Sequence, residues 1–317
     1  MAILKTHIHM LCMEQKKDLI IKGDVLTLGQ QAVFSTISDV KAILALYNVQ
    51  LKELPSDFNT STKIPSWKGN PHYGKYINAQ SLFIMMGADN VYATDVSTYE
   101  DPDFIINLND PVEDNYYEKF DTIVDFGTLE HIFDIPTALD NISKMLKKGG
   151  HVVLALPCSN FIDHGFYSFS PTLLFDYFGA NGFSNMGCYL REGSPYIYEK
   201  KHRLFRYKYV DKEIPIVSCQ AIEVAFLATK NKKYNPNYTI KPIQSIYSQN
   251  ELWNTSNGNS RSTSGFVSMG GGSLRGKIKE FLRWNLLYYM ISFSPVFVDK
   301  LIFGWIRGKN LKYLGKY

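Results

Sequence analysis

The stretch 120–157 constrains the fold of this chain more than any other part of its sequence. It contains a β-branched apolar run at Thr122–Phe126, a stretch Thr137–Leu146 whose apolar residues fall on one helical face, and a continuous apolar run at Val152–Leu156. A proline precedes the second stretch and Lys-Lys-Gly-Gly follows it, as is typical of helix boundaries. The order strand, helix, strand predicts a βαβ unit with two parallel strands and a right-handed crossover.

In sheets of this kind, ligands bind beyond the carboxyl ends of the strands. Small and polar residues replace the apolar run directly after the first strand, in Asp125–Gly127 and Thr128–His131. The segment Leu129–Ile132 reads Leu-Glu-His-Ile, and Leu146–Gly150 reads Leu-Lys-Lys-Gly-Gly. These two segments resemble the fourth-strand and fifth-strand signatures of the class I S-adenosylmethionine-dependent methyltransferases, and the resemblance covers roughly Asp24–Lys230.

The resemblance implies a Rossmann-like, doubly wound α/β fold. Its sheet would be seven-stranded and mostly parallel with an antiparallel last strand, and we expect a C-terminal helical tail beyond it. Met186–Leu190 and Ile214–Thr229 are the expected last two strands, which form an antiparallel hairpin at one edge of the sheet in the family. The implied cofactor is S-adenosylmethionine, and the implied activity is methyl transfer.

The first turn of the chain argues against a dinucleotide cofactor. Asp24–Gly29 is the expected opening strand and ends in a glycine. A dinucleotide-binding turn carries Gly-x-Gly-x-x-Gly because backbone amides must reach a pyrophosphate, whereas this turn has one glycine. A nicotinamide, flavin or nucleotide-sugar enzyme is therefore disfavoured. S-adenosylmethionine has no phosphate, and the resemblance implies that Gly29 and Gln30 contact it, although the family usually has more glycines here.

Two strand ends supply the next candidates for cofactor binding. Asp95 ends the expected second strand, Val91–Asp95, where the family has its ribose-binding acid, and a carboxylate can accept from both vicinal hydroxyls. An ordinary turn aspartate is the alternative. Asn107 follows the third strand, where the family contacts the adenine amino group, and Leu108 would pack on the ring. The alternative for Asn107 is a turn-forming residue before Pro111.

The turn after the fourth strand completes the implied cofactor site. We assign Asp125, Phe126 and Gly127 to it, because backbone carbonyls at this turn would accept from the amino group of the cofactor. Glu130 could contact the same amino group or orient a histidine.

Two histidines are candidate catalytic bases. Methyl transfer requires an acceptor held in line with the S–CH3 bond and a group that manages its proton. His131 follows the fourth strand, and His164 lies in the aromatic-rich loop Cys158–Ser170 after the fifth. The alternatives are that His131 packs under the next helix and that His164 is an ordinary polar loop residue. The nearby acids are not grouped with His or Cys at metal-ligand spacing, so we expect no metal site.

Composition shifts along the chain predict its organisation. The predicted parts are an N-terminal extension 1–23, a methyltransferase domain 24–232 with an insertion 47–76, a flexible linker 233–273 and a basic aromatic segment 274–317. Within the insertion, His72, Tyr73 and Lys75 either face the site or belong to a solvated loop. The segment Tyr196–Tyr209 either binds an anionic acceptor or forms a solvated face.

Charge and cysteine content restrict the partners and the compartment. The chain has 34 Lys and Arg against 30 Asp and Glu, an excess too slight to indicate nucleic acid. Its four cysteines lack metal-ligand spacing, and neither a signal peptide nor a membrane-spanning run is evident, so we expect a cytoplasmic protein with reduced thiols. The segment 274–317 suits the inner face of a membrane, the chain's own domain or a second subunit. Its pattern does not predict an oligomeric state.

We therefore expect a methyltransferase that modifies a hydroxyl of a small molecule or glycan, as in surface-polysaccharide biosynthesis. The alternative is a non-catalytic scaffold that retains the fold and has lost cofactor binding at the glycine-poor first turn.

Overall fold

The computed structural model divides the chain into two compact units, and every helix and strand named below belongs to the first. That unit comprises Met1–Tyr209, Gln220–Pro242 and Leu311–Tyr317, and the second comprises Val210–Cys219 and Ile243–Asn310. The structure describes residues 2–61, 75–193, 202–209, 216, 218, 220–231, 234–235, 238–245 and 311–317.

Several sequence-based predictions fall outside the described residues. These are His72 and Tyr73 of the insertion, residues 196–201 of the Tyr-rich segment, most of the linker and residues 274–310 of the C-terminal segment. Contact of that segment with a membrane stays a prediction. Within the described part of the chain, no helix is both long enough and apolar enough to cross a bilayer.

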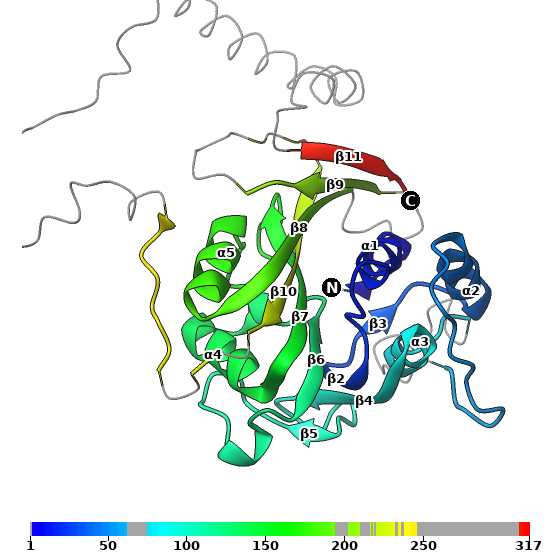
Figure 1. The fold of residues 1–317 in the computed structure, drawn as a ribbon, viewed down its shortest axis with the longest axis horizontal. Coiled ribbons are helices and arrows are strands. Elements are labelled where there is room, and N and C mark those ends of the chain that lie inside the picture. Colours follow the sequence, from blue (N-terminus) through cyan, green and yellow to red (C-terminus); the bar gives the residue numbers. More distant parts are fainter. Residues whose placement is uncertain are drawn as a thin grey trace, which may run out of the picture. The chain divides into compact units, whose positions relative to one another are not determined.

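A mixed sheet runs through the unit (Figure 1). Its strands are β2 (Gly23–Leu28), β4 (Ala88–Asp95), β5 (Phe104–Ile105), β6 (Phe120–Asp125), β7 (Leu146–Ser159), β8 (Phe183–Gly193), β9 (Arg203–Tyr207), β10 (Ala221–Lys230) and β11 (Leu311–Lys316). They lie in the order β5-β4-β2-β6-β7-β10-β8-β9-β11. The first five pair in parallel, and β10 lies antiparallel between β7 and β8.

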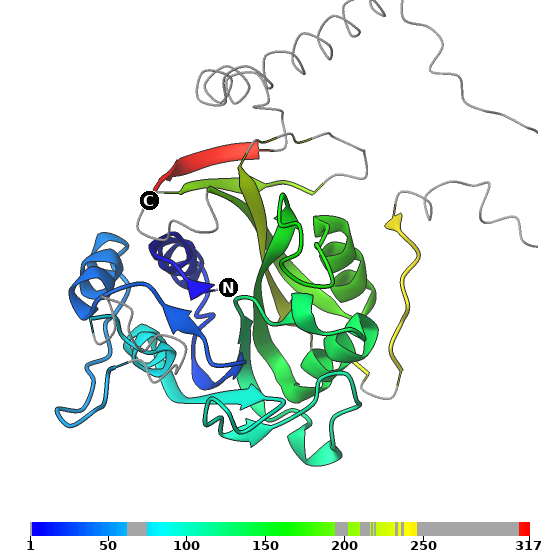
Figure 2. The same ribbon diagram turned by 180° about the vertical axis from the view of Figure 1, so that it is seen from behind.

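Helices cover both faces of this sheet. They are α1 (Lys5–Gln15), α2 (Ile37–Leu46), α3 (Ala79–Met86), α4 (Ile135–Met145) and α5 (Pro171–Ala180). Helices α4 and α5 lie on one face and α1, α2 and α3 on the other, and the reverse view in Figure 2 shows the same three layers. The arrangement is a Rossmann-like α/β fold, as expected from the sequence.

The predicted βαβ unit is confirmed as β6, α4 and β7, with β6 parallel to β7. The side chain of Asp134 accepts a hydrogen bond from the Thr137 amide and caps α4, and the following proline lies in its first turn. The apolar face of α4 is buried, through Ala138, Leu139, Ile142 and Met145. Residues Val152–Leu156 of β7 are also fully buried, as a strand covered on both faces requires.

The sheet differs from the expected one at its antiparallel edge. Nine strands of the described residues form it rather than seven, and the pair β8 and β10 is not at the edge. Strand β9 pairs with the outer edge of β8, and β11 pairs with the outer edge of β9. Without these partners, the backbone N–H and C=O groups along the outer edges of β8 and β9 would be left unpaired. Residues 311–316 are therefore a strand, whereas a helical tail was expected.

The N-terminal residues contribute to the core. The two-residue strand β1 (Ala2–Ile3) pairs in parallel with β3 (Ala32–Val33), directly beyond the first turn. Helix α1 follows, and its Ile8, Met10 and Leu11 are completely buried. Each such side chain contributes about 1.5–3 kcal/mol to folding, so residues 1–23 are an integral layer of this unit.

Candidate active site

The strand order reverses between β2 and β6, so a ligand crevice is expected at the carboxyl ends of these two strands. The turn after β2 contains Gly29, whose φ of +72° favours glycine. The Thr128 hydroxyl, from the turn after β6, donates to the Leu28 carbonyl at 2.6 Å. A Cβ on Gly29 would lie 2.9 Å from that hydroxyl oxygen. The two turns are therefore joined at the point where the sheet reverses.

Asp95 lies beside the first turn, as the sequence predicts. The Gly29 amide donates to the Thr94 carbonyl at 2.7 Å, which brings the turn against the end of β4. The Asp95 carboxylate is half-buried and accepts from the Ser97 amide at 3.1 Å. Burial raises the pKa of Glu100, and the negative charge of Asp95 raises it further. Gln30 donates to the Asp101 carbonyl at 3.4 Å and so contacts the loop after β4.

Apolar side chains beside Asp95 are exposed. Val96 is 65% exposed and Tyr99 69% exposed, whereas Leu108, the predicted adenine contact, is only 4% exposed. Leu108 packs inside the protein because the chain turns after β5. The Asn107 side chain stabilises that turn, since it donates to Asp110 at 2.6 Å and accepts from the Asn109 amide at 3.2 Å. Val96 was not among the residues predicted from the sequence, although its position directly after the strand-end carboxylate was a usable signal.

The turn after β6 is organised by the fully buried Asp125. Its carboxylate accepts from the amides of Gly127, Thr128 and Leu129 at 2.8–3.0 Å. Burial raises the pKa of Asp125, and these three amides oppose that effect. Both carboxylate oxygens thus hold the turn, and Phe126 is buried. Only the backbone atoms of this turn therefore remain to contact a cofactor.

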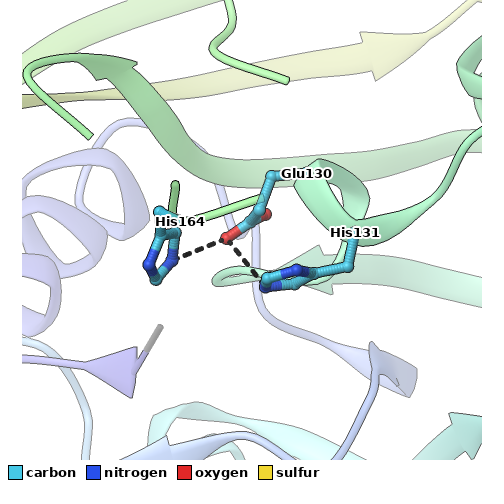
Figure 3. A group of neighbouring side chains, drawn as sticks. All are labelled: Glu130, His131 and His164. Carbon is cyan, nitrogen blue, oxygen red and sulfur yellow. Dashed lines mark ion pairs between the residues drawn. The ribbon is translucent and has the colours of Figure 1, made fainter. Parts of the chain in front are cut away.

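Glu130, His131 and His164 form a cluster at the same end of the sheet (Figure 3). Glu130 and His131 belong to the single-turn helix η3 (Leu129–His131). The Glu130 Oε1 atom lies 3.4 Å from Nε2 of His164 and 3.8 Å from Nε2 of His131. The Glu130 side chain is buried, whereas those of His131 and His164 are 50% and 34% exposed. Both imidazole rings point toward the carboxylate.

A glycine brings His164 to this position. A Cβ on Gly165 would lie 2.7 Å from the Glu130 carbonyl oxygen, and the Phe166 amide donates to the same oxygen at 2.7 Å. The loop after β7 thus docks directly on η3. This contact groups a carboxylate with two histidines, which the sequence spacing did not predict, because the third residue comes from another loop.

The cluster combines an acid with two proton acceptors. Burial and the negative charge of Asp125 raise the pKa of Glu130 to about 8. Burial lowers the pKa of both His131 and His164. At neutral pH, these shifts favour a protonated carboxyl group and neutral imidazoles. Neutral imidazoles can accept a proton or bind a metal ion.

Exposed aromatic rings lie around the cluster. Phe133 is 70% exposed and Phe166 66% exposed, and their ring centroids are 5.8 Å apart at an interplanar angle of 89°. The Tyr167 hydroxyl donates to the Phe133 carbonyl at 2.8 Å and links the two loops that carry these rings. Apolar surface of this kind around polar groups is typical of ligand-binding sites.

A methyltransferase domain model matches residues 74–208. The matched segment contains β4 to β9 and the Glu130 cluster, and the strands outside it complete the expected order around β2. Residues 74–208 of the chain therefore belong to a methyltransferase domain. Its cofactor is S-adenosylmethionine, and its reaction is methyl transfer.

Solved structures similar to this methyltransferase include several other methyltransferases. The N-methyltransferase NodS from Bradyrhizobium japonicum WM9 is 12% identical, covering 72% of this chain and 97% of its own, with a TM-score of 0.34. A possible histamine N-methyltransferase from Thermotoga maritima is 14% identical, covering 70% and 89%, with a TM-score of 0.35. The 1,6-didemethyltoxoflavin-N1-methyltransferase from Burkholderia thailandensis, solved with S-adenosylhomocysteine, is 12% identical, covering 71% and 78%, with a TM-score of 0.33.

These similarities are too low to carry an argument, so the assignment of a methyltransferase domain depends on the match over residues 74–208. The comparison with curated proteins finds no match.

A buried network of His7, Arg191 and Glu223 borders the site, and these residues were not predicted from the sequence. Glu223, at the start of β10, pairs with Nε2 of His7 at 2.5 Å and with the Arg191 guanidinium at 2.9 and 3.1 Å. Although burial opposes ionisation, Arg191 and His7 hold the pKa of Glu223 well below its usual range. An Arg and a Glu within otherwise apolar strands were the available signal, since buried charges are normally paired.

Two cavities lined by described residues lie elsewhere. One of 400 Å³ lies between the end of α1 and the strands β7, β8 and β10, and one of 490 Å³ lies beside α4 and α5. Neither includes a residue of the Glu130 cluster or Asp95. The candidate active site is therefore defined by the convergence of strand ends.

Proposed function

We propose that this methyltransferase transfers the methyl group of S-adenosylmethionine to a hydroxyl of a small polar acceptor, with a sugar or glycan hydroxyl as the preferred class. The observation that carries this proposal is the convergence of two imidazoles, whose pKa values burial lowers, on the buried Glu130 carboxyl. A hydroxyl is a poor nucleophile until its proton is removed, so an O-methyltransferase benefits from a base at this position.

In this proposal, the cofactor binds at the carboxyl ends of β2 and β4. The half-buried Asp95 beside the Gly29 turn would accept from the ribose hydroxyls. The exposed Val96 would pack on the adenine ring. Asn107 would contact the adenine amino group only if its turn hydrogen bonds were exchanged, so Asp95 is the stronger assignment.

The exposed rings of Phe133 and Phe166 support a sugar-like acceptor. Their faces offer an apolar surface for the C–H side of a pyranose ring, and the neighbouring histidines offer polar contacts for its hydroxyls. During the reaction, the acceptor oxygen bonds to the methyl carbon as the S–CH3 bond breaks. The bonding electrons stay on sulfur to give S-adenosylhomocysteine, and an imidazole of the cluster takes the hydroxyl proton.

Calorimetric titration with S-adenosylmethionine tests the proposed contribution of Asp95 to cofactor binding. The parent protein should bind one equivalent, and Asp95→Ala should weaken binding at least about tenfold, because a carboxylate that accepts two hydroxyls contributes more than about 1.4 kcal/mol. Asp89→Ala is the matched control, since Asp89 lies at the other end of the same strand in a solvent-exposed pair with Lys52. Equal affinity of the Asp95 variant and the parent would contradict this assignment.

Transfer from ¹³C-methyl-labelled cofactor to a panel of glycosides and cell extracts tests the acceptor class. The product should carry an O-methyl resonance, and His164→Ala should slow its formation at least tenfold while leaving cofactor binding within about twofold of the parent. An N-methyl or C-methyl product would overturn the acceptor assignment. Failure to bind the cofactor at all would support a scaffold role.

A further inference from the structure

The Glu130 cluster contains buried polar atoms that lack hydrogen-bond partners. Both carboxylate oxygens of Glu130 and Nε2 of His164 are buried, and no partner for any of them occurs among the described residues. Such an atom typically costs about 1–3 kcal/mol when left unsatisfied. Oε1 of Glu130 and Nε2 of His164 face each other at 3.4 Å, and the two loops that carry them meet at Gly165.

The distances within the cluster are too long for hydrogen bonds. An N–H···O hydrogen bond measures about 2.7–3.2 Å, whereas the two histidine nitrogens lie 3.4 and 3.8 Å from the Glu130 oxygen. The same chain contains a buried histidine–carboxylate pair in direct contact, His7 and Glu223, at 2.5 Å. The wider spacing of the Glu130 cluster therefore leaves room for an atom between the side chains.

A metal ion fits the 3.4 Å spacing of Glu130 and His164, and His131, at 3.8 Å from Glu130, would move toward the ion by a few tenths of an ångström. Nitrogen and oxygen ligands lie about 2.0–2.2 Å from Zn²⁺ and similar ions, so two ligands at tetrahedral or octahedral angles are about 3.0–3.4 Å apart. The ligand atoms of the three residues all lie within 4.8 Å of one another. We propose that Glu130, His131 and His164 bind one divalent transition-metal ion.

The ligand types select the class of ion. Two imidazoles and one carboxylate favour Zn²⁺, Fe²⁺, Co²⁺ or Mn²⁺ over Mg²⁺ and Ca²⁺, which prefer oxygen ligands. Three protein ligands leave coordination positions open, as in catalytic metal sites. The open side faces outward, because His131 and His164 are partly exposed whereas Glu130 is buried.

The ion would act on the acceptor, and this consequence rests on the proposed function. One or two hydroxyl oxygens of the acceptor would occupy the open positions, between the cluster and the rings of Phe133 and Phe166. A metal-bound hydroxyl loses its proton more readily than a free one. With the ion bound, the imidazole lone pairs are occupied, so the proton would pass to water and this route would replace the imidazole base of the metal-free protein. Acceptors with two neighbouring oxygen donors would then be preferred.

Titration with Co²⁺ tests the site without any methyl-transfer assay. Protein freed of metal with a chelator, and then freed of the chelator, should take up one equivalent of Co²⁺ with visible d–d absorption, and Zn²⁺ should displace it. Glu130→Gln and His164→Ala should each weaken binding at least about 100-fold, since both remove a direct ligand. His9→Gln is the matched control, because His9 lies outside the cluster, against Tyr47.

Thermal unfolding of each variant separates a lost ligand from a lost fold. A folded Glu130→Gln variant that binds Co²⁺ as tightly as the parent would overturn the proposal, as would a parent that shows no one-equivalent binding. Titration of the metal-free parent with S-adenosylmethionine distinguishes the two proposals. Co²⁺ binding without cofactor binding would refute the proposed function alone. Transfer that a chelator does not slow would leave the imidazoles as bases and refute only the role of the ion in the reaction.

Discussion

Gly165 lies so close to Glu130 that a Cβ on the glycine would stand 2.7 Å from the Glu130 carbonyl oxygen. The Phe166 amide donates to that oxygen at 2.7 Å. This backbone contact joins the loop after β7 to the loop after β6, and it places His164 beside the Glu130 carboxylate. The geometry of the candidate site therefore depends on the absence of a side chain at one position.

Gly165→Ala should separate the two loops. We expect a destabilisation of about 1–3 kcal/mol, because the added methyl group meets backbone that cannot move freely. Methyl transfer should fall at least tenfold, while affinity for S-adenosylmethionine stays within about twofold, since Asp95 lies on another strand. Urea unfolding and single-turnover transfer measure the two effects. Gly179→Ala in α5 is the control, because the atom nearest to its added methyl group is the flexible end of Met186. Unchanged methyl transfer by Gly165→Ala would refute the role of Gly165 in positioning His164.

Gly29→Ala should destabilise the protein for two reasons that a double-variant cycle separates. The φ of +72° disfavours alanine, and the new methyl group would lie 2.9 Å from the Thr128 hydroxyl. We expect a loss of about 1–3 kcal/mol in the free energy of unfolding. In a Thr128→Ala background the loss should be smaller by about 0.5–1 kcal/mol, because only the φ strain remains. Equal losses in the two backgrounds would show that the turns do not touch.

Arg191→Met should be strongly destabilising. It leaves the buried Glu223 without its guanidinium partner, and such a change typically costs about 3–5 kcal/mol. Lys5→Met is the matched control, since the Lys5–Asp39 pair is partly exposed, at 49% and 30%, and should contribute at most about 1 kcal/mol. Denaturant unfolding at neutral pH measures both variants. A loss below 1 kcal/mol for Arg191→Met would mean that Glu223 is stabilised by other groups.

Lys230 should make stability depend on alkaline pH. Its side chain is buried, and burial lowers its pKa to about 8. Between this value and the usual value near 10.5, the unfolded chain holds a proton that the folded protein does not hold, so the Lys230 contribution to stability rises with pH across that interval. It should change by about 3 kcal/mol at most. The difference in unfolding free energy between the parent and Lys230→Met should follow this rise from pH 8 to pH 10.5, and a constant difference would contradict it.

Local patterns in the sequence were sufficient for the central part of the fold. The unit of β6, α4 and β7 was predictable because hydrophobic periodicity, a proline and a glycine turn act within a few residues of one another. The neighbourhood of Gly29 and Asp95 also followed from the sequence, because parallel strands carry their carboxyl ends to one edge of the sheet.

Contacts between distant segments were decided by the tertiary structure. His164 reaches Glu130 through a loop whose path depends on Gly165, and His7 meets Glu223 across 216 positions of the chain. The pairing of β11 with β9 and the burial of Leu108 likewise depend on which surfaces remain open after the sheet has formed. By itself, the sequence determined the central unit of β6, α4 and β7 and the residues at the ends of β2, β4 and β6, because these depend on local periodicity. Only the tertiary structure decided which side chains meet, because such contacts depend on loop paths and register that no local pattern encodes.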